Sequence, residues 1–224
     1  MDQSGQGGQP PSGPPQGWQS SPQPPAPPPG GGQPGGMPSW TNNLTARGTM
    51  SGPAGVALAD VPDRVIAWII DAIIIGIVGW IVASVTTSVL GDNFLGIFGI
   101  GTFKVASVVS VVVALVVMLA ATAAYFWYMY TQMGGATIGM RVMKLSVKDA
   151  TSGGTISQNQ ALTRWALLGA PLAIYWGVFG WGIISLLAAL GLLVWEIYLI
   201  VTTAQSSTRQ GFHDTYAKTV VAKG

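Results

Sequence analysis

Long apolar segments constrain this chain more than any other feature of its sequence. One runs from about residue 65 to 88 and a second from about 105 to 130, and the second contains no charged residue. As helices, both are long enough to cross a bilayer, because about 20 apolar residues suffice. Asp71 lies inside the first segment, but the surrounding isoleucines and valines outweigh the cost of about 3 kcal/mol for inserting one carboxylate. We therefore expect two transmembrane helices here.

The third apolar stretch, from Trp165 to about Ala204, is too long for a single span. Three glycines lie near its middle, where a tight turn fits best. We therefore expect two further spans, at about 163–179 and 182–204. Only 8% of the residues are charged, whereas a soluble domain is about one-quarter charged. Both observations indicate an all-α membrane protein of about four transmembrane helices.

Residues 1–55 have a different composition from the rest of the chain. They contain thirteen of the fifteen prolines and only two charged residues, Asp2 and Arg47. Such a segment buries too little apolar surface to offset the entropy of ordering. We expect a disordered cytoplasmic tail, followed by one transmembrane domain over residues 56–224. The PxxP spacings in the tail suit an SH3-like or WW-like protein partner, and a simple spacer is the alternative.

The polar segment between the second and third spans has a strand pattern. Arg141 to Lys148 alternates in part between apolar and polar side chains, and Asp149 to Gly154 has the composition of a turn. We expect a small cytoplasmic β-hairpin-like loop at the membrane surface, closed by residues 155–156. Ser157 followed by Gln160 is typical of a capping box and predicts the start of a helix.

The basic residues fall on one side of the predicted bilayer. Nine of the ten lie in the tail, the central loop or near the cytoplasmic helix ends, and only Lys104 lies between the first two spans. By the positive-inside rule, the central loop and both chain termini are cytoplasmic. We therefore expect a multi-pass protein of the cell membrane, with its N- and C-termini in the cytoplasm.

Several ionisable residues lie near the same predicted boundary. Asp71 and Glu196 are each about seven or eight residues from the cytoplasmic end of their spans. An intramembrane acid normally faces the bundle interior or a water-filled cavity and has a polar partner. We predict a polar cluster in the inner leaflet, and its members are Arg64, Asp71, Arg164, Glu196, Arg209, His213 and Asp214.

The residues allow two roles for this cluster. In one, Asp71, together with Glu196, binds and releases a proton or a small cation. In the other, Asp71 is ionised, pairs with Arg64 or Arg164, and sets the helix packing. The histidine–aspartate pair has no nucleophile of defined geometry beside it, so we expect no enzymatic activity.

Composition excludes several other kinds of site. There is no cysteine and only one histidine, so thiolate and multi-histidine metal sites are excluded. The glycine-rich segment 134–139 lacks the lysine and hydroxyl residue of a phosphate-binding loop and is expected to be a turn. The basic residues form no stripe, so we expect no nucleic-acid partner. We expect no cofactor.

Three motifs accompany the spans. They run from Arg64 to Asp71, from Gly134 to Val142 and from Arg209 to Val221. In order and spacing they resemble the RDD family of membrane proteins, which is named for an arginine and two aspartates. The first is similar to the family's arginine at the mouth of span one and its aspartate within that span. The second resembles its glycine-threonine-glycine-lysine turn, and the third its closing arginine, histidine-aspartate and threonine-valine pattern.

The resemblance covers about residues 57–222, and Arg164 matches a later arginine of the family. Two positions depart from it. Met140 stands where the family usually has lysine, and Lys218 stands where glycine is common. A role for that family lysine therefore cannot be transferred to this chain.

The resemblance implies little about biochemistry, because most members of the family have no assigned activity and cation/proton exchange has been proposed for a few. One hypothesis is a small-cation or proton-coupled transporter in the lipid bilayer. A four-span transporter would need to be a homo-oligomer, associated across small-residue faces such as Gly76/Gly79 or Ala120 to Ala124. The alternative is a non-transporting scaffold whose proline-rich tail recruits a protein partner.

Overall fold

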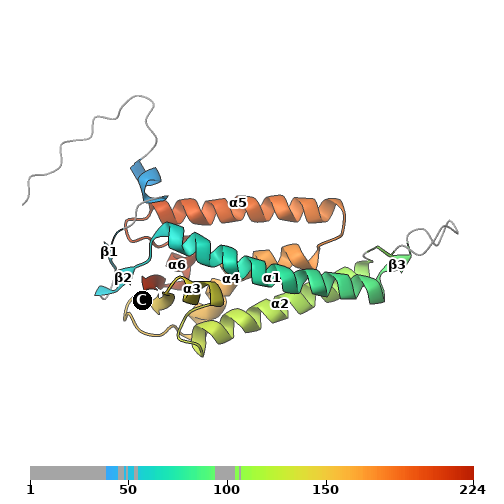
Figure 1. Ribbon diagram of the computed structural model, residues 1–224, viewed down its shortest axis with the longest axis horizontal. Coiled ribbons are helices and arrows are strands. Elements are labelled where there is room, and N and C mark those ends of the chain that lie inside the picture. Colours follow the sequence, from blue (N-terminus) through green and yellow to red (C-terminus); the bar gives the residue numbers. More distant parts are fainter. Residues whose placement is uncertain (1–38, 45–47, 49, 53–54, 94–103, 106) are drawn as a thin grey trace, which may run out of the picture. The chain divides into compact units, whose positions relative to one another are not determined.

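The computed structural model describes residues 39–44, 48, 50–52, 55–93, 104–105 and 107–224. Most of them are helical. Four long helices run alongside one another, α1 (Val61–Leu90), α2 (Val108–Thr131), α4 (Gln158–Gly177) and α5 (Ile183–Gln205) (Figure 1). They correspond to the four apolar segments expected from the sequence. The fold is therefore an all-α membrane architecture with a small antiparallel sheet, as predicted.

Helix α1 directs its large apolar side chains away from the bundle interior. Its buried face is a four-residue repeat of mostly small residues, from Ala67 and Asp71 to Gly79 and Ala83. Isoleucines on the opposite faces are exposed, and Ile73 and Ile77 each keep 58% of their surface. This distribution suits a helix surrounded by lipid, where small residues permit close helix contact and large apolar residues face the acyl chains.

Helices α2 and α4 make the most extensive contact in the bundle. A Cβ added at Gly177 would lie 2.6 Å from the Leu115 Cα, and one at Gly169 would lie 2.7 Å from the Phe126 ring. These glycines allow the two backbones to approach closely. Helix α4 begins at the capping box predicted from the sequence, in which Ser157 and Gln160 satisfy each other's backbone N–H groups.

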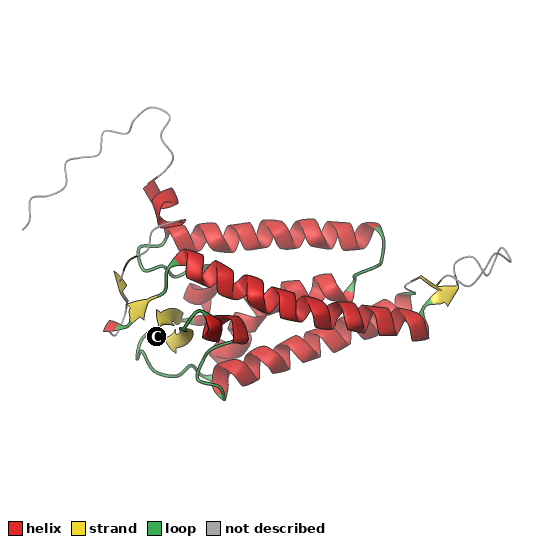
Figure 2. Ribbon diagram, viewed as in Figure 1, coloured by secondary structure: helices red, strands yellow, loops and turns green. Residues whose placement is uncertain are grey.

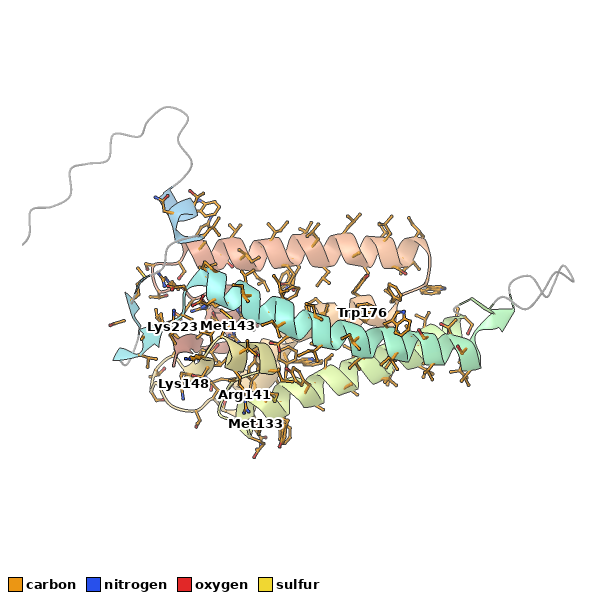
Figure 3. The ribbon with its side chains drawn as sticks, viewed as in Figure 1. Met133, Arg141, Met143, Lys148, Trp176 and Lys223 are labelled. Carbon is orange, nitrogen blue, oxygen red and sulfur yellow. The ribbon has the colours of Figure 1, made fainter. Side chains whose placement is uncertain are left out.

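The Gly76/Gly79 face of α1, expected to mediate self-association, is covered within the chain. A Cβ at Gly76 would lie 3.1 Å from the Trp176 ring, and one at Gly79 would lie 2.5 Å from it. Trp176 is labelled beside α1 in Figure 3. This glycine pair therefore accommodates a tryptophan from α4 and is not available to a second copy.

Helix α5 is the least buried of the candidate spans. Only 6% of its most apolar window is buried, compared with 22% for α1 and 28% for α2. Leucines and isoleucines along its length are exposed, and Leu187 and Val194 keep 60% and 67% of their surface. Most of the surface of this helix is therefore available to lipid.

Three helices, α1, α2 and α5, are long and apolar enough to cross a membrane among the described residues. Helix α4 has 20 residues, but its first two turns are polar and include Arg164. The apolar part, residues 165–177, would extend roughly 20 Å, which is shorter than the hydrocarbon core of about 30 Å. The fourth expected span is thus a helix of the bundle, and its crossing of the bilayer stays a prediction.

A four-stranded antiparallel sheet lies at one end of the bundle, and a two-stranded one, β3 (Asp92–Asn93) and β4 (Lys104–Val105), lies at the other (Figure 2). The larger sheet has the order β1-β2-β6-β5. Its ranges are Met50–Ser51 (β1), Ala57–Leu58 (β2), Leu145–Asp149 (β5) and Thr219–Lys223 (β6). It joins segments from three widely separated parts of the sequence.

The strand expected in the central loop is present as β5, but its partner differs from the prediction. Leu145 lies opposite Lys223 and Asp149 lies opposite Thr219, so β5 pairs with β6 near the C-terminus and not with residues 155–156. Val147 and Val221 are fully buried in this pairing. The local alternation indicated a strand, but it contained no information about a partner far along the chain.

The remaining short elements are η1 (Ser39–Leu44), α3 (Ile138–Val142) and α6 (Phe212–Ala217). Residues 1–38, with the expected PxxP docking motifs, lie outside the described residues. Within the expected tail, Ser39–Leu44 forms a 3-10 helix and Met50–Ser51 pairs with Ala57–Leu58. The folded body therefore begins before residue 55.

Candidate polar site at the sheet end of the bundle

Asp214 is the centre of the polar site. It lies on α6 with no exposed side-chain surface, and it forms ion pairs with Arg64 at 2.8 Å and with Arg164. Arg164 also donates hydrogen bonds to the Thr219 hydroxyl at 3.1 Å and to the Tyr130 hydroxyl at 3.3 Å. Two guanidinium groups thus share one buried carboxylate, which leaves this group of three with one excess positive charge.

Arg64 joins α1 to the sheet as well as to α6. One terminal nitrogen binds Asp214, and the other donates to the Val221 backbone oxygen at 3.3 Å. Its Nε is buried without a hydrogen-bond partner among the described residues. The described residues therefore satisfy only part of the hydrogen-bonding capacity of Arg64.

His213 lies beside the same carboxylate, with its Nε2 3.5 Å from Asp214 Oδ1. Burial lowers the pKa of His213 well below its usual value, and the positive charges of Arg164 and Arg64 lower it further. The histidine is therefore neutral at pH 7. Its Nδ1 is buried, and no described residue forms a hydrogen bond with it.

Arg209 belongs to a second ion-pair network. It binds Asp60 and donates to the Gly48 carbonyl at 3.3 Å. Lys223 lies 3.6 Å from Asp60 and 2.9 Å from Asp63. Burial raises the pKa of Asp60, but the Gly48 N–H bond and the two cations outweigh it, so the pKa is lowered overall. This network connects α1 to the sheet and does not include Asp214.

Asp71 has neutral partners. Its carboxylate accepts hydrogen bonds from the Thr137 hydroxyl at 2.5 Å, the Tyr125 hydroxyl at 2.8 Å and the Gly139 N–H at 2.9 Å. The Ile138 N–H in turn donates to the Tyr125 hydroxyl. Asp71 therefore joins α1 to α2 and to the start of α3. The structural interpretation predicted an ion pair between Asp71 and Arg64 or Arg164. Among the described residues, both arginines bind Asp214 instead.

Glu196 differs from the other acids of the predicted cluster. Its Oε1 is buried on α5 with no hydrogen-bond partner among the described residues. It lines a cavity of about 420 Å³ whose wall is formed mainly by α1, α4 and α5. Five of the seven predicted site residues line this cavity, namely Arg64, Asp71, Arg164, Glu196 and His213. The cavity is thus the feature that most of the predicted cluster shares.

The RDD family model matches residues 58–218, which is well over half of the 224-residue chain. The chain belongs to the RDD family. No curated protein and no solved structure matches it. Within this RDD domain, the first arginine motif and the histidine-aspartate motif, 150 residues apart, meet in the Arg64–Asp214 ion pair.

Several residues of the site were not singled out from the sequence of this RDD protein. Tyr125 and Tyr130 lie in the most apolar segment, where nothing distinguished them from ordinary core aromatics. Thr137 was present only as part of a glycine-rich turn, yet it caps α3 and binds Asp71. Asp60 precedes the first span and showed no helical spacing to Arg209. In each case the partner is distant in the sequence.

The two departures from the RDD pattern have structural counterparts. Met140, at the usual lysine position, is buried and lines the cavity. Lys218, at the common glycine position, has a φ of 53° in the left-handed region and ends α6. The backbone there has the conformation that favours glycine.

Proposed function

We propose that this RDD protein is a membrane transporter that exchanges a proton or a small monovalent cation at Glu196. The observation that carries the proposal is the buried Glu196 Oε1, which has no partner among the described residues and belongs to a residue lining the cavity. Unpaired intramembrane carboxylates are typical of ion and proton pathways. A structural role would be expected to give this oxygen a donor within the protein.

The charges around the cavity support the same proposal. Arg64 and Arg164 contribute two positive charges, and Asp71, Asp214 and Glu196 contribute three negative charges when ionised. The set therefore has one uncompensated negative charge, because His213 is neutral. One proton or one monovalent cation at Glu196 would neutralise the site, which is costly to leave charged in a low-dielectric environment.

Asp71 has a supporting role in this proposal. Its carboxylate already accepts three hydrogen bonds, and releasing it for exchange would break the connection between α1 and α3. We assign exchange to Glu196 and positioning of the helices to Asp71. An enzymatic role has less support, because both oxygens of Asp214 already bind guanidinium groups.

The proposed location is the cell membrane, with both termini in the cytoplasm. Arg141, Lys148 and Lys223 lie at the sheet end of the bundle (Figure 3), whereas Lys104 belongs to β4 at the opposite end. This distribution supports a cytoplasmic sheet end by the positive-inside rule. An alkaline phosphatase fused after Gly224 should be inactive, and a fluorescent protein fused there should fluoresce. The reverse result would contradict either the proposed orientation or the crossing of the bilayer by α4.

Exchange is tested by reconstitution in liposomes that contain a pH-sensitive dye, with gradients of Na⁺, K⁺ or Li⁺. The wild type should change the internal pH in response to at least one gradient. Glu196→Gln should abolish this response, because an amide cannot bind and release a proton, while Glu196→Asp retains a carboxylate and should keep part of it. No cation-dependent response from folded wild-type protein would contradict the proposal.

The second hypothesis, a scaffold with a partner-recruiting tail, rests on residues 1–55. Most of that tail lies outside the described residues, so the observations that favour it are compositional. Deleting residues 1–38 separates the two proposals. Exchange should persist without this segment, whereas recruitment of a protein partner should be lost.

A further inference from the structure

The cavity is larger and more apolar than a site for a proton or small cation requires. Most of its lining is aliphatic, including Val65 on α1, Leu168 and Leu172 on α4, and Leu192 and Ile200 on α5. A cavity of about 420 Å³ falls within the range of pockets that hold organic ligands. Water is a poor occupant of the aliphatic part of this space, because apolar walls offer it few hydrogen bonds.

The cavity is also elongated along the helices. Its lining on α1 extends from Val61 to Ile75, which is a helical rise of roughly 21 Å. One leaflet contributes about half of a hydrocarbon core of about 30 Å. A single acyl chain, which spans about 15 Å of that core, therefore fits within the long dimension of the cavity and leaves room for a head group.

The polar residues that line the cavity present three buried atoms without partners among the described residues. They are Arg64 Nε, which is a donor, Glu196 Oε1, which is an acceptor, and His213 Nδ1, which is either one in a neutral ring. Leaving such atoms unpaired is costly. A hydroxyl group can donate to Glu196 Oε1 and so satisfies this acceptor without adding charge.

The cavity reaches the lipid-facing surface between α1 and α5. Ile69 on α1 lines it and keeps 46% of its surface exposed, and Leu193 and Ile197 on α5 line it with 56% and 51% exposed. These residues lie within candidate membrane spans. A ligand dissolved in the bilayer can therefore reach the cavity laterally, without passing through water.

We propose that this cavity binds one single-chain lipid with an uncharged hydroxyl head, such as a monoacylglycerol or a long-chain alcohol. The chain lies between α1, α4 and α5, and the hydroxyl donates to Glu196. An anionic head would place a second negative charge beside the Glu196 carboxylate, and it is disfavoured for that reason. The proposal does not rest on exchange, because it requires Glu196 only as a hydrogen-bond acceptor, but a bound lipid and a bound cation would compete for the same Glu196 oxygen.

Thermal unfolding of the full chain in detergent tests the cavity. Monoolein should raise the Tm of the wild type by roughly 5–10 °C at a hundredfold excess over its Kd. Ala189→Phe fills the cavity and should abolish this rise, while Ala166→Phe, at an exposed site of α4 outside the cavity lining, is the matched control and should keep it. Equal rises in both variants would overturn the proposal.

A second measurement does not depend on how a variant folds. A long-chain alcohol with a photoactivatable group along its chain is cross-linked to the wild type, and the labelled peptides are mapped by mass spectrometry. Adducts should concentrate in residues 65–75 and 189–200, which line the cavity. Adducts concentrated on the exposed face of α2, around Val112 and Val116, would indicate bulk lipid contact and overturn the proposal.

The head group is tested by comparing monoolein with oleic acid and oleylamine in the same unfolding measurement. The uncharged lipid should give the largest rise in Tm, and a larger rise with either charged lipid would overturn the hydroxyl assignment. Glu196→Gln distinguishes this proposal from exchange. Its amide oxygen remains an acceptor, so monoolein binding should persist in the variant in which exchange is lost.

Discussion

The Thr137 hydroxyl donates a hydrogen bond of 2.5 Å to the Asp71 carboxylate, although 66 residues separate them in the sequence. Thr137 also caps α3, and its oxygen accepts from the Met140 N–H. The carboxylate inside the first span therefore fixes the start of the segment that follows the second span. Asp71 therefore acts mainly by stabilising the fold.

Replacing Asp71 by Asn should destabilise the protein by about 2–3 kcal/mol, because hydroxyl and backbone donors would face an amide and lose charge-assisted hydrogen bonds. Glu196→Gln is the matched control, since it also removes one intramembrane charge but breaks no hydrogen bond of the unpartnered Oε1 within the described residues. Its effect should be below about 1 kcal/mol. Thermal unfolding in detergent measures both, and a larger loss for Glu196→Gln would contradict the roles assigned to the two acids.

The effects on stability of substitutions at Asp214 and Arg164 should be strongly coupled. Asp214→Asn leaves Arg64 and Arg164 buried without their counter-charge, and we expect a loss of about 3–5 kcal/mol. Arg164→Gln should cost a similar amount, but the double variant should cost less than the sum, because removing the second charge relieves the first. Arg141→Gln, at an exposed site, should change stability by less than about 1 kcal/mol. Additive single effects at Asp214 and Arg164 would contradict a shared ion pair.

Lys218 offers a stabilising substitution. Its φ of 53° is unfavourable for a side chain with a Cβ, and glycine adopts this conformation at little cost. Lys218→Gly should therefore raise stability by about 1 kcal/mol. Lys148→Gly, within strand β5, should lower it instead, since glycine weakens strand interiors. Destabilisation by Lys218→Gly would show that its side chain makes a contact more important than the backbone strain.

The sequence predicted those parts of the fold that depend on local pattern. The helices of the spans follow from runs of apolar residues, and α4 begins at the capping box of Ser157 and Gln160. Strand β5 was recognisable from alternation, but its pairing with β6 was not, because pairing depends on which buried faces meet after the helices have packed. Local pattern determines an element, and tertiary packing selects its partner.

The site shows the same division. The location of the charged residues near one end of the bundle could be predicted from their distance to the span ends, but their pairing could not. Arg64 lies seven residues before Asp71 and binds Asp214, while Asp71 binds Thr137 and Tyr125. Spacing along one helix did not predict these pairings, because α2, the α2–α3 segment and α6 supply partners that lie closer. The cavity had no sequence signal, since its walls come from several elements.

His213 should make stability depend on pH. Its pKa in the folded protein lies well below the value near 6.5 of a free histidine, because burial, Arg164 and Arg64 disfavour the charged ring, and the nearby Asp214 carboxylate does not compensate. As the pH falls below about 6.5, the unfolded chain takes up a proton that the folded protein does not, so the free energy of unfolding decreases. The slope approaches about 1.4 kcal/mol per pH unit. Unfolding measured between pH 7.5 and 5 should show a steeper loss for the wild type than for His213→Gln, and identical slopes would mean that the folded protein protonates this histidine.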